Sequence, residues 1–181
     1  MRAIALFVTA VGRLNTVVGR TFAWLVPISV LICFAVVIQR YVFSTTQLWL
    51  QDLYVWLNGA MFMALAGYTL LINGHVRVDI LYRPAGLRRK AIMDLVGVLI
   101  FLLPFCAVVW IWGFEYVHRA WMLHEGSESP GGMPGLYILK TFILVFVALV
   151  GLQGVAMALR SVLVLAGRES LLPVAYRYPV E

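Results

Sequence analysis

The side chains that could do chemistry gather in one segment of the chain. It contains Glu115, His118, His124, Glu125 and Glu128. Glu115 and His118 lie one helical turn apart, a spacing that two ligands of one metal ion can use. The histidines nevertheless lack a ligand spacing typical of zinc sites, and no nucleophile or carboxylate pair accompanies them. We therefore predict no metal site, no cofactor and no catalytic residue in this chain.

The composition is that of an integral membrane protein. Of the 181 residues, 63% are hydrophobic and 12% are charged, whereas about a quarter of the residues of soluble domains are charged. The formal net charge is +6, but the basic residues form no clustered face. We therefore predict no nucleic-acid partner and attribute the positive excess to membrane topology.

Four uncharged runs divide the sequence. They are enclosed by Arg20 and Arg40, Asp52 and His75, Asp94 and Glu115, and Lys140 and Arg160, and contain 19, 22, 20 and 19 positions. About 20 apolar residues in a helix cross the hydrocarbon core of a bilayer, and helices satisfy every backbone group there. The sequence thus predicts transmembrane helices at about 21–39, 50–73, 93–114 and 137–160. Pro27 and Pro104 are expected to kink the first and third helices without ending them.

The interiors of these runs contain no charged residue and no histidine. Ionisable groups at the bilayer centre mark ion paths, proton relays and substrate sites, so the chain is predicted to have no transport site of its own. The polar residues expected inside the membrane are Asn58 and Gln153. Small residues that allow close helix packing, either within the chain or against another subunit, are Ala60, Ala64, Gly67, Gly151 and Gly154.

The distribution of Lys and Arg predicts the orientation, because positive residues near helix ends stay in the cytoplasm. Eleven lie on one side: Arg2, Arg13, Arg20, Arg77, Arg83, Arg88, Arg89, Lys90, Arg160, Arg168 and Arg177. Three lie on the other: Arg40, Arg119 and Lys140. Both termini are therefore expected to be cytoplasmic (N-in/C-in), with the segments near 40–52 and 113–140 facing outward.

The first 20 residues predict an amphipathic helix on the inner membrane surface. At 100° per residue its arginines share one side, and Ile4, Phe7, Val11 and Leu14 occupy the other, with Asn15 as a polar exception. The tail 161–181, with Pro173 and Pro179, is expected to be cytoplasmic and irregular. The fold prediction is thus an all-α integral membrane protein, a single membrane domain over 1–181 with four transmembrane helices and an N-terminal amphipathic interfacial helix.

Several short motifs occur on these four helices in a fixed order. They are Arg40-Tyr41-Val42-Phe43, Trp49-Leu50-Gln51-Asp52, His75-Val76-Arg77-Val78-Asp79, the set Glu128-Ser129, Gly131-Gly132, Pro134, Tyr137 and Lys140, and Leu152-Gln153-Gly154. Their order and spacing resemble the small membrane subunit, or Q subunit, of tripartite ATP-independent periplasmic (TRAP) transporters. The resemblance extends roughly from Arg13 to Arg160. Asp52 stands where the family often has Glu.

This resemblance implies a non-catalytic bacterial inner-membrane subunit. Its partners would be a large membrane subunit, which carries the substrate and sodium sites and moves by an elevator mechanism, a periplasmic substrate-binding protein, and membrane lipids. The motif forms are most similar to a branch labelled for mannitol or chloroaromatic compounds, a label that also covers organic or 2-oxo acids. The transported solute stays open.

Ten residues are candidates for partner contacts: Arg40, Asp52, His75, Arg77, Asp79, Glu115, Glu125, Glu128, Ser129 and Lys140. Together with Arg119, the carboxylates Glu115, Glu125 and Glu128 are expected to project outward, where rim charges steer docking of the binding protein. Asp52 lies close in depth to Arg40, so a partly desolvated pair is expected there. The alternatives are a four-helix assembly or anchoring protein of another membrane complex, and, more weakly supported, a membrane-embedded enzyme.

Overall fold

The described part of the chain is entirely helical. The computed structural model describes residues 1–75, 82 and 84–178, and no strand occurs among them. Four helical stretches are long and apolar enough to cross a membrane: Arg2–Tyr41, Leu48–Leu71, Leu87–Met122 and Leu136–Leu165. The prediction of an all-α protein with four membrane spans is therefore confirmed.

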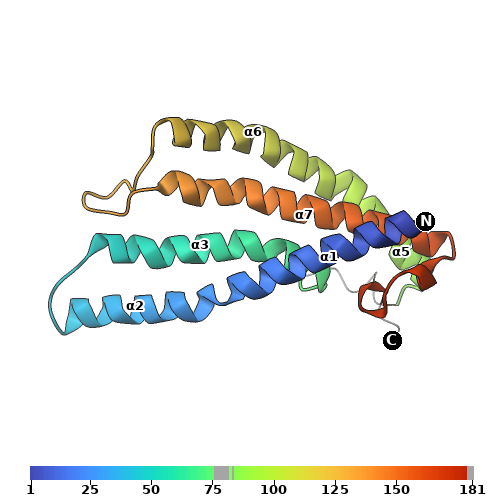
Figure 1. Cartoon of the computed structure of the whole chain (residues 1–181), viewed down its shortest axis with the longest axis horizontal. Coiled ribbons are helices and arrows are strands. Elements are labelled where there is room, and N and C mark those ends of the chain that lie inside the picture. Colours follow the sequence, from blue (N-terminus) through green and yellow to red (C-terminus); the bar gives the residue numbers. More distant parts are fainter. Residues whose placement is uncertain (76–81, 83, 179–181) are drawn as a thin grey trace.

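The first stretch consists of two helices that follow each other almost without interruption (Figure 1). Helix α1 (Arg2–Ala23) and helix α2 (Leu25–Tyr41) are separated by Trp24 alone. Pro27 explains the break, because its ring has no N–H for the carbonyl four residues earlier, that of Ala23, and also clashes with it. The predicted boundary at residues 20 and 21 is therefore wrong by a few residues, and no loop separates the two helices.

Helix α1 packs along the bundle instead of standing apart from it. It contacts α3 (Leu48–Leu71) and α7 (Leu136–Leu165). Two residues of the predicted apolar side, Phe7 and Leu14, are exposed on the surface of the bundle. The buried face is made of smaller residues: Ala5, Val8, Val11, Gly12, Asn15 and Gly19. Small side chains let the axis of α1 approach its neighbours closely, and its position relative to the membrane surface stays a prediction.

The third stretch contains an irregular turn at the place where a kink is expected. Helix α5 (Leu87–Gly97) continues through a π-helical turn (Val98–Leu102) into α6 (Leu103–Met122). Pro104 follows this turn directly and removes one helical hydrogen bond, which the wider turn accommodates. The helices also run past the predicted limits, from 87 to 122 and on to 165. A charged residue ends the apolar run but not the hydrogen-bonded helix, so charge gaps underestimate helix length.

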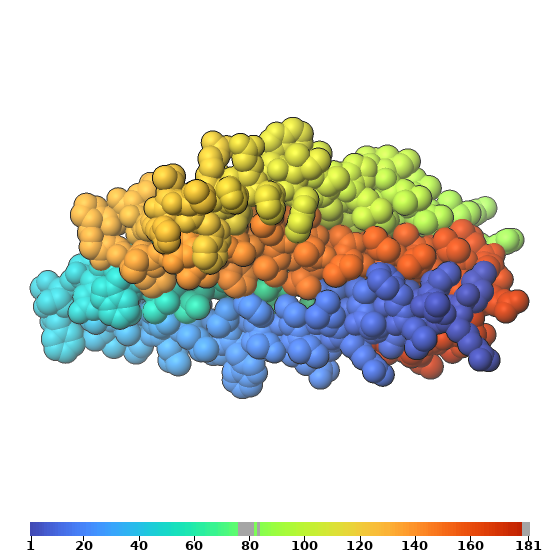
Figure 2. Space-filling model, turned by 45° about the horizontal axis from the view of Figure 1, so that its top comes forward, coloured from blue at the N-terminus to red at the C-terminus, as the bar shows by residue number. Residues whose placement is uncertain are grey.

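Helix α7 is the central element of the bundle. It packs against α1, α3, α5 and α6, and its surface runs between α6 on one side and the α1–α2 stretch on the other (Figure 2). We call the end that holds both termini and α5 the terminal end, and the end that holds the connections 42–47 and 123–135 the loop end (Figure 1). These two ends correspond to the predicted inner and outer sides.

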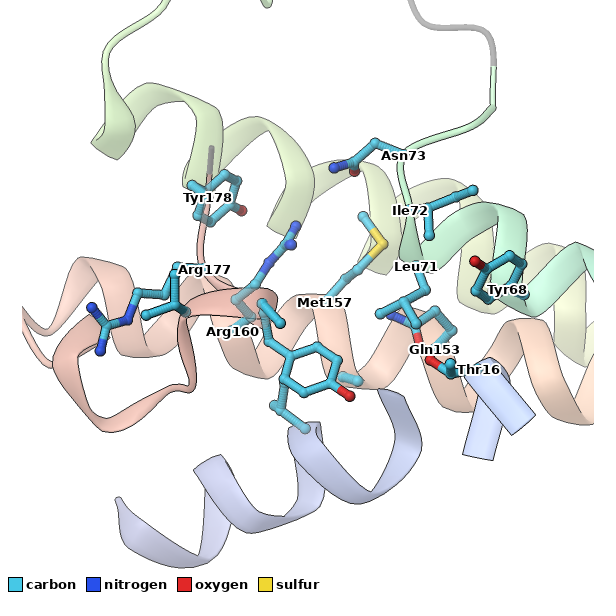
Figure 3. A pocket seen from close by; sticks show the side chains of 15 residues that line it. Thr16, Tyr68, Leu71, Ile72, Asn73, Gln153, Met157, Arg160, Arg177 and Tyr178 are labelled. Carbon is cyan, nitrogen blue, oxygen red and sulfur yellow. The ribbon is translucent and has the colours of Figure 1, made fainter. Parts of the chain in front are cut away.

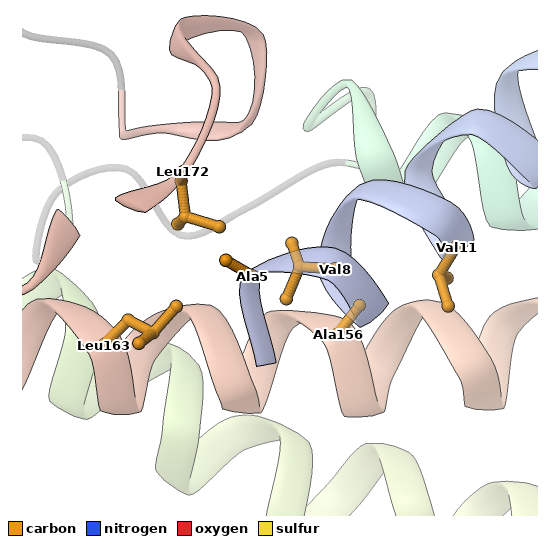
Figure 4. Close-up of a cluster of buried hydrophobic side chains, with 6 residues drawn as sticks. All are labelled: Ala5, Val8, Val11, Ala156, Leu163 and Leu172. Carbon is orange, nitrogen blue, oxygen red and sulfur yellow. The ribbon is translucent and has the colours of Figure 1, made fainter. Parts of the chain in front are cut away.

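The described part of the tail after α7, residues 166–178, contains local helical turns where an irregular segment is expected. It forms two short 3₁₀ turns, Glu169–Leu171 and Val174–Tyr176. Leu172 between them is 1% exposed and joins a cluster with Ala5, Val8 and Val11 of α1 and Ala156 and Leu163 of α7 (Figure 4). A single large aliphatic side chain buried in this way stabilises by about 1.5–3 kcal/mol and so contributes to holding the tail against the bundle.

A polar contact lies in the middle of the bundle. The side-chain amide of Asn15 donates to Oε1 of Gln153 at 3.0 Å, and both residues are buried. Asn15 is therefore the partner of Gln153 and not a flaw in the apolar face of α1. Asn58, in contrast, is exposed, so the prediction that it is a buried polar residue is wrong.

Gly67 makes this contact possible. A Cβ atom there would collide with Oδ1 of Asn15 and lie 3.0 Å from Cβ of Leu149. Ala64, one turn earlier on α3, is fully buried. The small residues of α3 thus pack inside this chain, against α1 and α7.

We predict that Gly67→Ala separates α1 from α3 and α7 and destabilises the protein by about 1–3 kcal/mol, the usual cost of overpacking. Gly97→Ala is the matched control, since nothing lies within 4 Å of its added methyl group. The control should be unchanged or slightly more stable, because alanine favours helix over glycine. Thermal unfolding in detergent micelles measures both, and equal midpoints would contradict the packing described for Gly67.

Candidate interaction sites at the two ends of the bundle

At the loop end, Asp52 fastens the connection between α6 and α7 to the start of α3. Its Oδ2 atom accepts a hydrogen bond from the backbone N–H of Met133 at 2.9 Å. The loop comes so close that a Cβ atom at Gly132 would lie 2.5 Å from Asp52 Oδ2 and 2.5 Å from Ser127 Oγ. The carboxylate therefore binds the loop backbone. The expected pair with Arg40 is absent, since Arg40 is exposed and Asp52 is turned toward the loop.

A second contact holds the other side of the same loop. Lys140 Nζ lies 2.5 Å from Glu125 Oε2 and 4.2 Å from the centroid of the Tyr116 ring. The side chain of Lys140 is only 12% exposed, and that of Glu125 is 34% exposed. Glu125 is thus an internal partner of α7, and its role as a docking charge stays a prediction. The loop folds back over the first turns of α7, which brings positions 125 and 140 together.

Aromatic side chains complete the loop end. Trp121 donates from its indole N–H to Thr141 Oγ1 at 2.9 Å, and its ring lies 4.5 Å from that of Tyr137. His118 stacks on Phe114, and His124 meets Tyr137 edge to face. Within the described ranges no group of three His, Cys, Asp or Glu side chains could hold a metal ion. The two histidines therefore act as aromatic packing partners.

The remaining candidates at the loop end are exposed. Glu115 pairs with Arg119 across one helical turn at 3.6 Å, with both side chains about 70% exposed, so the pair contributes little to stability. Glu128, Ser129 and Arg40 are exposed as well. These five side chains are exposed, in contrast to the internal contacts of Asp52, Glu125 and Lys140.

At the terminal end lies a buried polar cluster that the sequence prediction missed. Arg160 Nη2 of α7 donates to Asp94 Oδ2 of α5 at 3.2 Å, and the two side chains are 10% and 7% exposed. The same oxygen accepts from Tyr178 at 2.7 Å and from Tyr82 at 3.1 Å. Ser161 Oγ lies 3.0 Å from the Tyr178 hydroxyl. Three donors thus converge on one carboxylate oxygen.

Tyr178 closes this cluster from the tail. The Arg160 guanidinium lies over the Tyr178 ring, with its carbon 4.2 Å from the ring centroid. The backbone N–H of Tyr178 donates to Glu169 Oε1 at 3.2 Å. Burial raises the pKa of the Tyr178 hydroxyl above its ordinary value, so the phenol stays protonated and remains a donor to Asp94.

The sequence contained only a weak signal for this cluster. Asp94 and Arg160 bound two of the uncharged runs, so their opposite charges fall at the same predicted depth. Nothing in the pattern indicated Tyr178, because it follows a proline-containing tail. His75, the remaining described candidate, is exposed and has Nε2 at 3.3 Å from the Ala66 carbonyl oxygen. Arg77 and Asp79 lie outside the described residues.

Comparison with known protein families assigns the chain. Residues 29–166 match the family described as tripartite ATP-independent periplasmic transporters, DctQ component. The chain belongs to this family. It is therefore the small membrane subunit of a TRAP transporter. Neither a curated protein nor a solved structure matches the chain significantly.

The matched range covers most, but not all, of the bundle. It begins inside α2, ends just after α7, and includes Asp52, Asp94 and Arg160. Helix α1 and the tail after Ala166 lie outside it. Asn15 and Tyr178 are therefore contributions from outside the matched DctQ range that bind polar residues within it, Gln153 and Asp94 respectively.

We predict that Asp52 acts through its hydrogen bond and not through its charge. Asp52→Ala should loosen the loop by about 1–2 kcal/mol, the cost of leaving a backbone N–H unsatisfied, whereas Asp52→Asn keeps an acceptor oxygen and should behave nearly as wild type. Hydrogen exchange of residues 127–135 measures the difference. If Asp52→Asn raised the exchange of the loop as much as Asp52→Ala, the charge of Asp52 and not its hydrogen bond would hold the loop.

Proposed function

We propose that this chain is a non-catalytic scaffold subunit that enlarges the static part of a TRAP transporter. Its partner would be the large membrane subunit, which carries out sodium-driven uptake by an elevator mechanism. A periplasmic binding protein would deliver the solute, an organic acid or a related compound. The observation that carries this proposal is the match to the DctQ family over residues 29–166.

The interior of the described bundle supports a scaffold. The polar groups at its middle, Asn15 and Gln153, are neutral and bind each other. The buried ion pair, Asp94–Arg160, ties α5 to α7 at the terminal end. A carboxylate that accepts three hydrogen bonds is committed to structure, and it is a poor ligand for a passing ion. An anchoring role in another membrane complex has no comparable support.

Helix α2 is the surface best suited to a partner within the membrane. None of its residues is buried, and it packs mainly on α3. Its exposed apolar side chains include Val30, Leu31, Phe34 and Val37. Such a helix contributes little to the core of its own chain, so its outer face is free to pack against the large subunit or lipid.

The exposed part of the loop end is our candidate for docking of the binding protein. Glu128 and Ser129 lie on the loop itself, and the Glu115–Arg119 pair lies on the adjoining α6. This assignment requires the loop end to face the periplasm of a bacterial inner membrane and both termini to be cytoplasmic, as the Lys and Arg distribution predicts.

We expect this orientation to be visible by thiol labelling in cells with a permeabilised outer membrane. In a background with Cys33→Ala and Cys106→Ala, the variants Ser44→Cys and Glu128→Cys should react with an impermeant reagent. Arg88→Cys, exposed on α5 at the terminal end, should react only after the inner membrane is opened. Reaction of Arg88→Cys in intact spheroplasts would reverse the topology.

Isolation of the tagged chain from its native membranes tests the proposed function. A larger membrane protein should accompany it, and the cognate periplasmic binding protein should dock on that complex. Glu128→Lys should slow docking by about two- to tenfold because rim charges act mainly on association rates, while recovery of the complex stays unchanged. Arg88→Glu, a charge reversal at the opposite end, is the matched control.

Two results would count against the proposal. Isolation of the chain without any larger membrane protein would remove the scaffold function itself. Equal docking rates for Glu128→Lys and wild type would remove the docking surface and leave the scaffold function standing.

A further inference from the structure

A cavity of about 780 Å³ opens at the terminal end, between α1, α3, α7 and the tail (Figure 3). One part of its wall is apolar, formed by Val8, Leu71, Ile72 and Met157. Polar side chains also line it, among them Tyr68, Asn73, Gln153, Arg160, Tyr176 and Tyr178. Its volume falls in the range of about 300–1,000 Å³ typical of ligand sites.

Arg160 is the group in this cavity that still needs an acceptor. Its side chain is nine-tenths buried, and its guanidinium lies between Tyr178 and Asn73 in Figure 3. Nη2 binds Asp94, but Nε has no hydrogen-bond partner among the described residues. A buried N–H without an acceptor is unfavourable. Asp94 Oδ2, the acceptor for Nη2, is already shared by three donors.

The charge of the described lining favours an anion. It includes two cations, Arg160 and Arg177, and no carboxylate. Arg177 points away from the other labelled side chains in Figure 3 and donates to the backbone carbonyls of Leu172 and Ser170. Arg160 is therefore the cation of the described lining that is not turned away, and Tyr68 of α3 and Tyr176 of the tail add hydroxyl groups to the lining.

We propose that this cavity binds the phosphate group of an anionic phospholipid. The Arg160 guanidinium and the tyrosine hydroxyls would donate to the phosphate oxygens, and the apolar wall of Val8, Leu71, Ile72 and Met157 would take the beginning of an acyl chain. A free phosphate ion would use the donors but would leave the apolar wall and most of the volume unused. Basic pockets between transmembrane helices bind anionic headgroups in this way.

The test measures lipid retained by the full-length chain, extracted in mild detergent with any subunit that accompanies it. Mixed micelles containing phosphatidylglycerol or phosphatidylcholine supply the lipid, and native mass spectrometry counts the molecules bound. Wild type should retain one phosphatidylglycerol in preference to phosphatidylcholine. Inorganic phosphate, added alone at millimolar concentration, distinguishes a lipid site from a free-anion site and should not displace the lipid.

Two variants examine the donors separately. Asp94→Asn with Arg160→Gln neutralises both members of the pair together, so that no uncompensated charge is buried, and should lower phosphatidylglycerol retention by about tenfold or more. Tyr68→Phe with Tyr176→Phe keeps the ion pair and the fold and should weaken retention by about fivefold. Arg88→Gln with Arg89→Gln removes two exposed cations of α5 at the same end and should leave retention unchanged.

Each outcome decides the proposal. Loss of retention in the cavity variants, with the α5 control unaffected, supports it, and the tyrosine variant alone suffices if the charge variant does not fold. Equal retention of both lipids, displacement by inorganic phosphate, or a loss as large in the α5 control as in the cavity variants overturns it.

Discussion

The ion pair between Asp94 and Arg160 determines how the terminal end is built. In a low-dielectric interior either charge alone would be strongly unfavourable, so α5 and α7 must meet at this depth. The pair then requires further hydrogen bonds, and Tyr82 and Tyr178 supply them. Because Tyr178 belongs to the tail, the same requirement brings the tail against α7, where Leu172 completes the cluster with α1. The buried carboxylate thus links α5, α7 and the tail, and the tail in turn packs on α1.

The spans themselves were predictable from sequence because a bilayer imposes a simple constraint. Every backbone group must be satisfied within the helix, and about 20 apolar residues are needed to cross. The helix ends were not predictable in this way. Helix α5 begins at Leu87, with charged residues in its first turn, and α6 extends past Glu115 and Arg119. Helical hydrogen bonding continues through polar residues wherever their side chains can face water or a neighbour. Hydropathy therefore predicts the part of a helix that crosses the membrane and not the residues at which the helix ends.

The contacts between distant residues could not be predicted from the sequence. The sequence predicts Gln153 as a polar residue inside the membrane, but its partner Asn15 is 138 positions away and looks from sequence alone like an irregularity in an apolar face. Asp52 and Glu125 were predicted as partner contacts because they are charges near helix ends. In the structure one binds the backbone of Met133 and the other binds Lys140. A single sequence does not show which distant residues form such pairs, since the pairs depend on how helices pack and how a loop folds back across the bundle.

The central claim is that this chain supports transport without performing it. Reconstitution in proteoliposomes with an imposed sodium gradient, candidate organic acids and the cognate binding protein tests this most directly. The account predicts uptake when the large subunit is present together with this chain, and none from this chain alone at any solute concentration. Solute accumulation in vesicles that contain only this chain would contradict the account, because the described bundle would then have to contain a transport site.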